Sequence, residues 1–263
     1  MVRLKTAHDL RGIYASGQLA GRFLEEVRES IRPGVSTAEL DELARDFMAK
    51  NGARAAFLGY KGYPGSICVS VNEQVVHGIP GDRRLAGGDL VSVDVGVELD
   101  GYYADTAWSF LVDTPDGPPD TRRLMEGTHD SLYAGIGAVV RGERLRGVSR
   151  AIERELGRHS LGIVRELTGH GTGFELHEDP SVFNYDPMSN QGAIEDGLVV
   201  AIEPMAALGS GEVLQGKDKW LYFTADGSLA AHYEHTVACW EGRAWVLTDP
   251  ADEEARAAFG GLK

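Results

Sequence analysis

Apolar residues in the first fifty positions recur with the period of a helix. Steps of three and four over residues 7–31 place the apolar side chains on one face of a long helix, which a Pro-Gly pair then ends. Ser36, followed three residues later by Glu39, has the spacing of a capping box and predicts a second helix that ends near Gly52. The chain therefore opens with two amphipathic helices.

The next part of the chain changes to a period of two, which is typical of strands. Residues 66–71, 90–99 and 102–112 are predicted strands. Asp100-Gly101, between the last two, is a strong two-residue hairpin turn.

Folding this hairpin about its turn brings two aspartates together. The turn pairs Gly96 with Asp105 and Asp94 with Ala107, so both aspartates project from one face as diagonal neighbours, about 7–8 Å apart at the backbone. The opposite face carries four valines and should meet the helices. Taken alone, a hairpin of this kind more often has one solvated face, so a site here needs support from other segments.

The second half of the chain repeats this plan. After a connecting loop at residues 113–119, Asp120 is predicted to cap a helix that runs to about Val139, and a further helix begins near Ser149. The tripeptide Gly-Val-Ser occurs at the second helix of each half. Two helix–helix–hairpin repeats would bury both apolar faces on one shared sheet.

Two glutamates lie in apolar strands of this second half. Residues 198–202 form an apolar strand that ends at Glu203 before a proline, which favours a strand end or edge. Residues 220–224 and 229–240 are predicted to form a hairpin with Glu234 in its returning strand. Because buried glutamates are rarely unpaired, each requires a cation, either a metal ion or a distant Arg or Lys.

Composition excludes several classes of function. The chain has 263 residues and a net charge of −14, which argues against a protein that coats nucleic acid or binds DNA directly. Only two cysteines occur, as expected in a reducing compartment. Neither a signal peptide nor a membrane-spanning run is recognisable, so we expect a cytoplasmic protein that is not embedded in a membrane.

Five metal-competent side chains stand in distinctive local sequences. They are Asp94, Asp105, His170, Glu203 and Glu234. Like charges brought close together raise one another's pKa and resist ionising together, whereas two divalent cations would neutralise four carboxylates. The ligand set therefore indicates a two-metal centre.

Six segments in this order resemble the type I methionine aminopeptidases, metallopeptidases of the pita-bread family. They begin at Ser70 (SVNEQVVHGIP), Val93 (VDVG), Ala104 (ADT), Thr168 (TGHGTG), Ala201 (AIEPM) and Tyr233 (YEHT). The resemblance implies an α+β pita-bread fold in one catalytic domain, residues 1–263. Two pseudo-symmetric helix–helix–hairpin halves, about residues 6–112 and 120–247, would share a curved, mainly antiparallel sheet.

The same resemblance implies a role for each metal ligand. Asp94 would bind one ion, Asp105 and Glu234 would bridge two, and His170 and Glu203 would complete the second. The cofactors would be two divalent ions per chain, drawn from cobalt, manganese, iron and zinc.

The resemblance also implies catalytic and substrate-binding residues. Glu203 would relay protons, His177 would stabilise the oxyanion, and His77 would position the scissile amide. The methionine pocket would be formed by Tyr60, Tyr63, Cys68 and Trp220, with Phe57 and Leu176 beside it. His77 and His177 would also bind the substrate, near the scissile amide. His232 stands where a glutamine is frequent in the family.

The implied activity is removal of the N-terminal methionine from nascent proteins and peptides, with a preference for a small second residue. The expected partners are nascent polypeptide N-termini, with transient ribosome contact, and the expected state is a monomer. Two alternatives stay open. One is a proline-specific peptidase of the same fold, such as an Xaa-Pro aminopeptidase or prolidase, and the other is a non-catalytic binding relative.

Overall fold

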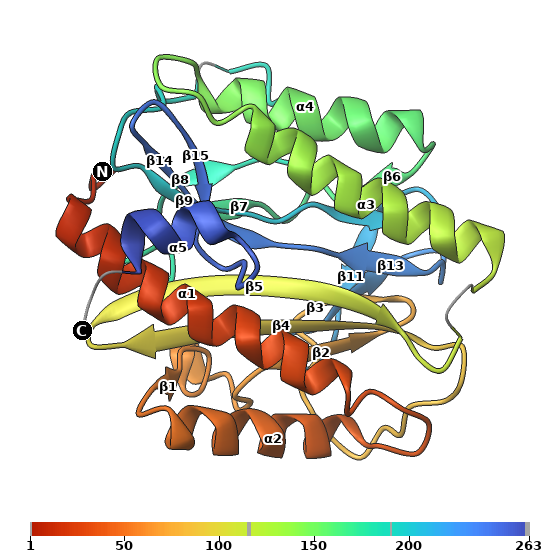
Figure 1. Ribbon diagram of the computed structural model, residues 1–263. Coiled ribbons are helices and arrows are strands. Elements are labelled where there is room, and N and C mark those ends of the chain that lie inside the picture. Colours follow the sequence, from red (N-terminus) through yellow and green to blue (C-terminus); the bar gives the residue numbers. More distant parts are fainter. Residues whose placement is uncertain (1, 115–116, 190, 261–263) are drawn as a thin grey trace.

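The computed structural model describes residues 2–114, 117–189 and 191–260 (Figure 1). Its helical elements are α1 (Ala7–Arg28), α2 (Thr37–Lys50), the 3-10 turn η1 (Tyr60–Gly62), α3 (Pro119–Gly137), α4 (Leu145–Arg158) and α5 (Glu253–Phe259). Its strands are β1 (Arg54–Ala55), β2 (Cys68–Val71), β3 (Gln74–Val76), β4 (Leu90–Leu99), β5 (Tyr102–Leu111), β6 (Gly162–Ile163), β7 (Gly169–Gly171), β8 (Glu178–Val182), β9 (Val199–Ile202), β10 (Met205–Ala207), β11 (Val213–Gln215), β12 (Tyr222–Thr224), β13 (Ala230–His232), β14 (His235–Trp240) and β15 (Arg243–Val246). The expected α+β class is confirmed.

The first two helices begin as the sequence predicts. In α2, the Ser36 hydroxyl accepts a hydrogen bond from the Glu39 backbone, and the Glu39 carboxylate accepts one from the Ser36 backbone, which completes the capping box. Helix α1 ends at Arg28, three residues earlier than predicted. Pro33 restricts the residue before it to extended conformations, so the chain leaves the helix before reaching it.

The hairpin of β4 and β5 has the predicted register over its whole length. Gly96 pairs with Asp105 and Asp94 pairs with Ala107. Its valine face packs on α1 and α2 in a buried core, as expected from the alternation. That core contains Leu19, Ala20, Phe23, Leu24, Val27, Leu40, Ala44, Phe47, Met48, Ile67, Val69, Val71, Leu85, Val91, Val93, Val95, Val97 and Val112.

The second half places α3 and α4 over a second group of strands. One sheet has the order β15-β14-β9-β7-β8 and another the order β13-β10-β6, with antiparallel pairing throughout both. Figure 1 shows α3 and α4 side by side on the opposite side of the molecule from α2. None of the helices in the described part of the chain combines the length and apolar character needed to cross a bilayer.

The two halves meet where β5 lies beside the start of β14. The Ala107 and Glu234 backbones exchange hydrogen bonds, at 3.3 Å and 2.9 Å. The Thr236 hydroxyl adds two more to the Asp105 backbone, at 2.9 Å and 2.8 Å. The polar face of the hairpin is consequently buried: Ser92 is 3%, Asp94 8% and Asp105 3% exposed. The alternative that this face of the hairpin is exposed to solvent is therefore wrong.

Two predicted helix starts are wrong. Asp120 does not cap α3, which begins at Pro119 after an N-cap residue, Pro118, without a side-chain bond. Proline suits the first helical position because it has no N–H to satisfy there. Helix α4 begins at Leu145, and Ser149 is buried one turn inside it, bonded to the Leu145 carbonyl. The two Gly-Val-Ser tripeptides therefore occupy different positions relative to their helices.

The predicted hairpin over residues 220–240 is also wrong. Strand β12 pairs with β11 and β3, whereas β13 pairs with β10. The turn between them exists, since Gly227 N–H donates to the Thr224 carbonyl, but it joins two different sheets. Glu234 lies in the gap between β13 and β14, not within a continuous strand.

Candidate metal centre

The β4–β5 hairpin of the first half and one segment of the second half present three carboxylates to one buried point. Asp94 and Asp105 come from β4 and β5, and Glu234 comes from the segment that bridges to Ala107. Ala107 itself pairs with Asp94, so one continuous ladder fixes all three backbones. Glu234 is only 2% exposed. The predicted convergence of these residues is thus visible in the structure.

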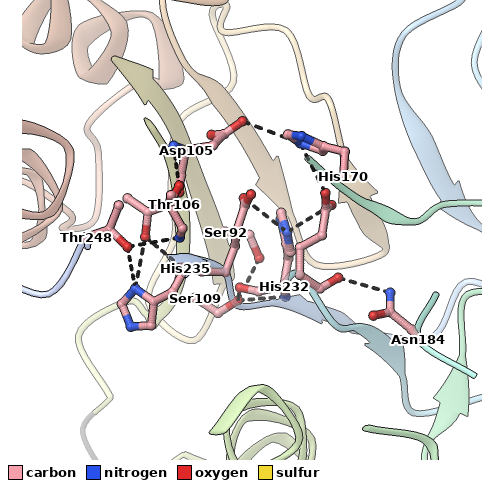
Figure 2. A network of polar contacts seen from close by, with 12 residues as sticks. Ser92, Asp105, Thr106, Ser109, His170, Asn184, His232, His235 and Thr248 are labelled. Carbon is pink, nitrogen blue, oxygen red and sulfur yellow. Dashed lines mark hydrogen bonds and ion pairs between the residues drawn. The ribbon is translucent and has the colours of Figure 1, made fainter. Parts of the chain in front are cut away.

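His170 and Glu203 approach from the neighbouring sheet. His170 in β7 pairs with Ala201 in β9, two residues before Glu203. The His170 Nε2 atom lies 3.5 Å from Glu203 Oε1 and 3.9 Å from Asp105 Oδ2 (Figure 2). Its Nδ1 atom lies 2.9 Å from the Gly171 carbonyl, which accepts the ring N–H and leaves the Nε2 lone pair facing the carboxylates.

The glycines that flank His170 allow this close packing. A Cβ at Gly169 would lie 2.4 Å from the Ala201 carbonyl oxygen, and one at Gly171 would lie 2.2 Å from the Asp179 carbonyl oxygen. Both contacts are with backbone, which cannot move aside as a flexible side chain can. The G-H-G sequence is therefore a requirement of the strand packing as well as of the site.

The charges of this cluster lack cationic partners. Among the described residues, no Arg or Lys forms an ion pair with Asp94, Asp105, Glu203 or Glu234, so the salt-bridge alternative is wrong. Burial, and then the charge of Asp105, raise the pKa of Asp94, Glu203 and Glu234. Burial raises the pKa of Asp105 to about 7.

The donor set fits a divalent metal centre. Asp94 Oδ1, Asp105 Oδ1 and Glu234 Oε1 are buried without a hydrogen-bond partner among the described residues. Donor atoms of Asp105, His170 and Glu234 all lie within 4.8 Å of one another. Buried anionic oxygens with unused lone pairs next to an imidazole match the oxygen-rich ligation of hard and borderline divalent cations.

A cavity of about 170 Å³ opens over these carboxylates. It is lined by Phe57, Tyr60, Lys61, Tyr63, Cys68, His77, Asp94, Asp105, His170, His177, Glu203, Trp220 and Glu234. Every metal, catalytic and substrate-binding residue named from the sequence is among them. Leu176 packs with Phe57, Tyr63 and Cys68 in a small apolar cluster at the same place.

The apolar wall of the cavity is held rigidly. The Tyr63 hydroxyl donates to the Ile67 and Gly78 carbonyls, at 3.1 Å and 3.0 Å. The Tyr63 ring meets Trp220 edge-on at 5.1 Å between centroids. Burial raises the pKa of the Cys68 thiol, so this sulfur is an uncharged part of the wall.

Two further histidines, His77 and His177, line the cavity. His177 stacks on Tyr60 at 5.1 Å between ring centroids, and burial lowers the pKa of His177 to about 3. His77 has a positive φ of 60°, an unusual conformation for a non-glycine residue, and burial lowers its pKa as well. Both rings are therefore neutral near pH 7 and each carries one N–H donor.

Sequence reasoning missed one residue of the cavity and assigned no role to another near it. Lys61 lines the cavity mouth, with its Nζ 5.1 Å from the centroid of the Tyr60 ring. Its position between Tyr60 and Tyr63 was the available signal. His232 was noted only as a departure from a frequent glutamine, yet its ring lies among the carboxylates.

Comparisons with known proteins agree on one family. The model of metallopeptidase family M24 matches residues 11–241. The chain is 49% identical to the methionine aminopeptidase of Borreliella burgdorferi, over 94% of this chain and 98% of that protein. It is 43% identical to methionine aminopeptidase 1 of Bacillus subtilis, over 94% and 99% respectively.

Solved structures give the same result. The methionine aminopeptidase of Thermotoga maritima superposes with a TM-score of 0.92 at 36% identity, covering 95% of this chain and 100% of that one. The prolidase of Pyrococcus furiosus gives a TM-score of 0.76 at 21% identity, covering 94% of this chain but 65% of that one. The second likeness concerns the fold alone. The expected pita-bread fold is confirmed.

Proposed function

The chain belongs to metallopeptidase family M24, and on that premise we propose that its five-residue cluster is the metal centre of a methionine aminopeptidase. The protein is a metal-dependent aminopeptidase that removes the N-terminal methionine from proteins and peptides. One observation carries the assignment of the site: in the part of the chain that the structure describes, four carboxylates without an Arg or Lys partner converge beside His170 in an aromatic-walled cavity.

The number of ions is part of the proposal. Four carboxylates and one neutral imidazole carry the charge that two divalent cations neutralise. Asp94 would bind one ion, Asp105 and Glu234 would contact both, and His170 and Glu203 would hold the second. When bound, divalent cations supply Lewis acidity, which lowers the pKa of water enough to provide hydroxide near neutral pH.

Glu203 is the proposed proton carrier of the reaction. It lies at the end of β9 with a side chain that is 13% exposed, so it faces the cavity and not the core. A carboxylate with a raised pKa accepts a proton from the attacking water and returns it to the leaving amine within one turnover. Glu203 would act in this way at the scissile amide.

His177 and His77 are the proposed hydrogen-bond donors to the peptide. His177 is neutral, stacks on Tyr60 and packs against the tilted His170 ring at 4.1 Å between centroids, so both neighbours restrict the direction of its ring. A fixed N–H stabilises the oxyanion of the tetrahedral intermediate without reorganisation. His77, whose ring meets Trp220 edge-on across the cavity, would bind the amide side of the scissile bond.

The wall of the cavity suits a methionine side chain. Methionine is flexible and polarizable, and its sulfur makes favourable contacts with aromatic ring edges. Tyr63, Trp220 and Phe57 supply such rings, while Cys68 adds a soft, uncharged sulfur. The resemblance to methionine aminopeptidases, and not the shape of the cavity, supports the further proposal that a small second residue is preferred.

A titration of metal into chelated enzyme tests the assignment. Release of methionine from Met-Ala-Ser should appear on adding manganese, cobalt, iron or zinc, and calorimetry should give two ions per chain. Asp94→Asn and Glu203→Gln should lose most turnover, whereas Glu126→Gln, at an exposed position on α3, should not. Full activity of Asp94→Asn at defined metal concentration would contradict the ligand assignment.

The proline-specific alternative has a direct test. Its support is the likeness of fold to a prolidase, of which this chain covers about two thirds. Parallel assays with Met-Ala-Ser and Ala-Pro-Ser separate the two activities, and we expect cleavage of the first only. Turnover of neither peptide at any metal concentration would favour the non-catalytic alternative.

The cellular setting is a further part of the proposal. Cys68 and Cys239 are both buried free thiols, which suits a reducing compartment such as the cytoplasm. Nascent chains leave the ribosome in that compartment. We therefore propose that the enzyme is a monomer that contacts the ribosome transiently. Sedimentation with and without translating ribosomes tests it.

A further inference from the structure

His232 stands out as a buried polar residue with no assigned task. It is the last residue of β13 and only 2% exposed. Neither of its ring nitrogens has a hydrogen-bond partner among the described residues. A buried polar group without a partner is costly, so a ring kept in this state requires an explanation.

The ring of His232 is aimed between two carboxylates of the site. Its Nε2 atom lies 3.7 Å from Glu203 Oε2 and 3.8 Å from Glu234 Oε2. Figure 2 shows the His232 and His170 rings at separate positions in the same polar network. His170 approaches the other oxygen of Glu203, Oε1, so the Glu203 carboxylate lies between two imidazoles.

The backbone of His232 is fixed by a serine pair. The Ser109 hydroxyl donates to the His232 carbonyl at 2.9 Å and accepts from the His232 N–H at 3.0 Å. The Ser92 hydroxyl lies 2.8 Å from that of Ser109 (Figure 2). Strand β13 is thereby attached to the polar face of the hairpin, which sets the direction of the ring.

The surroundings of the two rings give them different roles. In His170 the Nδ1 proton is held by the Gly171 carbonyl, so Nε2 presents a lone pair, as a metal ligand must. In His232, Nδ1 has no hydrogen-bond partner within the described ranges, and Nε2 faces two carboxylate oxygens. The Nε2 lone pair of His170 is compatible with nearby carboxylates only when a cation lies between them, whereas an Nε2–H on His232 is attracted to both carboxylates directly.

We propose that His232 is a positioning residue: its Nε2–H points between Oε2 of Glu203 and Oε2 of Glu234, at 3.7 Å and 3.8 Å, and attracts both electrostatically, closing to a hydrogen bond when cations bind. This inference rests on the proposed function, because it gives those carboxylates their orientation toward bound cations. Hydrogen bonds to ligating carboxylates restrict their rotation, and losing such partners typically costs about 10–100-fold in metal affinity or activity.

The test compares His232→Leu, which has no donor, with His232→Gln, which keeps an N–H of similar reach. Metal-free proteins would be titrated with manganese by calorimetry, and the visible spectrum of the cobalt-loaded forms would report ligand geometry. We expect His232→Leu to lose about 10–100-fold in manganese affinity. The affinity of His232→Gln should stay within about threefold of the wild-type value. The cobalt spectrum should change in the Leu variant only.

Two results would overturn the proposal. Wild-type affinity and spectrum in His232→Leu would mean that the ring does not orient the carboxylates. Equal damage in His232→Gln and His232→Leu would mean that the imidazole itself is needed, as a direct ligand. His232→Met, a second apolar variant, serves if the Leu protein does not fold, and far-ultraviolet circular dichroism checks this.

Failure of the proposed function is distinguishable from these outcomes. If the wild-type protein released no methionine with any metal, the activity would be wrong. The affinity ratios of the three proteins would still decide whether His232 positions carboxylates around a cation. Measuring kcat and KM separately on Met-Ala-Ser then shows whether the donor also serves the chemical step.

Discussion

Replacing Asp105 with Asn should stabilise the metal-free protein at pH 8. Asp105 is 3% exposed, its Oδ1 has no hydrogen-bond partner among the described residues, and its nearest charged neighbours are other carboxylates. Asn has nearly the same volume and carries no charge. The substitution therefore removes an electrostatic penalty without creating a cavity.

The size of the effect follows from the pKa. Burial raises the pKa of Asp105 from its ordinary 3.8 to about 7 in the folded state. Between these two pH values the folded protein holds a proton that the unfolded chain has released, so stability falls as pH rises through this window. At about 1.4 kcal/mol per pH unit, the full penalty above pH 7 is about 4 kcal/mol. For a chain of this length that corresponds to a rise of roughly 10 °C in Tm for Asp105→Asn.

Calorimetric melting of chelated protein at pH 5 and pH 8 measures this directly. The gain in Tm for Asp105→Asn should be large at pH 8 and should shrink at pH 5, where the wild-type carboxyl is protonated. Adding manganese should reverse the order, because only the wild type keeps its full ligand set. Asp186→Asn is the matched control: Arg146 lowers the pKa of Asp186 to about 2, so this change should destabilise at both pH values.

A lower Tm for metal-free Asp105→Asn at pH 8 would refute the reasoning. So would a gain of equal size at both pH values, since a purely steric effect does not depend on protonation.

Two further substitutions and one pH titration have defined outcomes. Tyr63→Phe should lower the free energy of unfolding by about 1–3 kcal/mol in urea titrations, because the Ile67 and Gly78 carbonyls lose their shared donor. Gly171→Ala should lower Tm and weaken manganese binding together, since its Cβ would lie 2.2 Å from a backbone oxygen beside His170. The ring signals of His177 in metal-free protein should show no titration from pH 8 to pH 5 by nuclear magnetic resonance, because burial lowers its pKa to about 3.

The positions of Asp94 and Asp105 could be predicted because the sequence features that determine them lie within one hairpin. The Asp100-Gly101 turn and the alternation of β4 together determine one register, and that register places Asp94 and Asp105 on one face. No contact from outside the hairpin is needed for this deduction. The capping box of α2 was predictable for the same reason, since Ser36 and Glu39 satisfy each other.

The position of Glu234 was not predictable in this way. The turn near Gly227 was recognised, but a turn does not specify which strands pair on either side of it. Here β12 extends one sheet and β13 another, so the segment that carries Glu234 is free to bridge to Ala107. Which edges meet depends on how the two halves pack, and the pairing partner of Glu234, Ala107, is distant in sequence. His232 was left without a role for the same reason, because its neighbours are distant in sequence.

The ladder from Asp94 through Ala107 to Glu234 explains how a cluster of buried charges survives without metal. A slip of one residue in either pairing would turn the side chains to the opposite face, into the valine core or toward the helices. The apolar faces of both halves therefore hold the carboxylates in place, and their mutual repulsion is stored in the metal-free fold. Binding free energy for a cation includes the release of that repulsion, so metal affinity and apo-protein instability share one origin. A substitution such as Asp105→Asn, which relieves the repulsion, must for this reason weaken the metal in the same step.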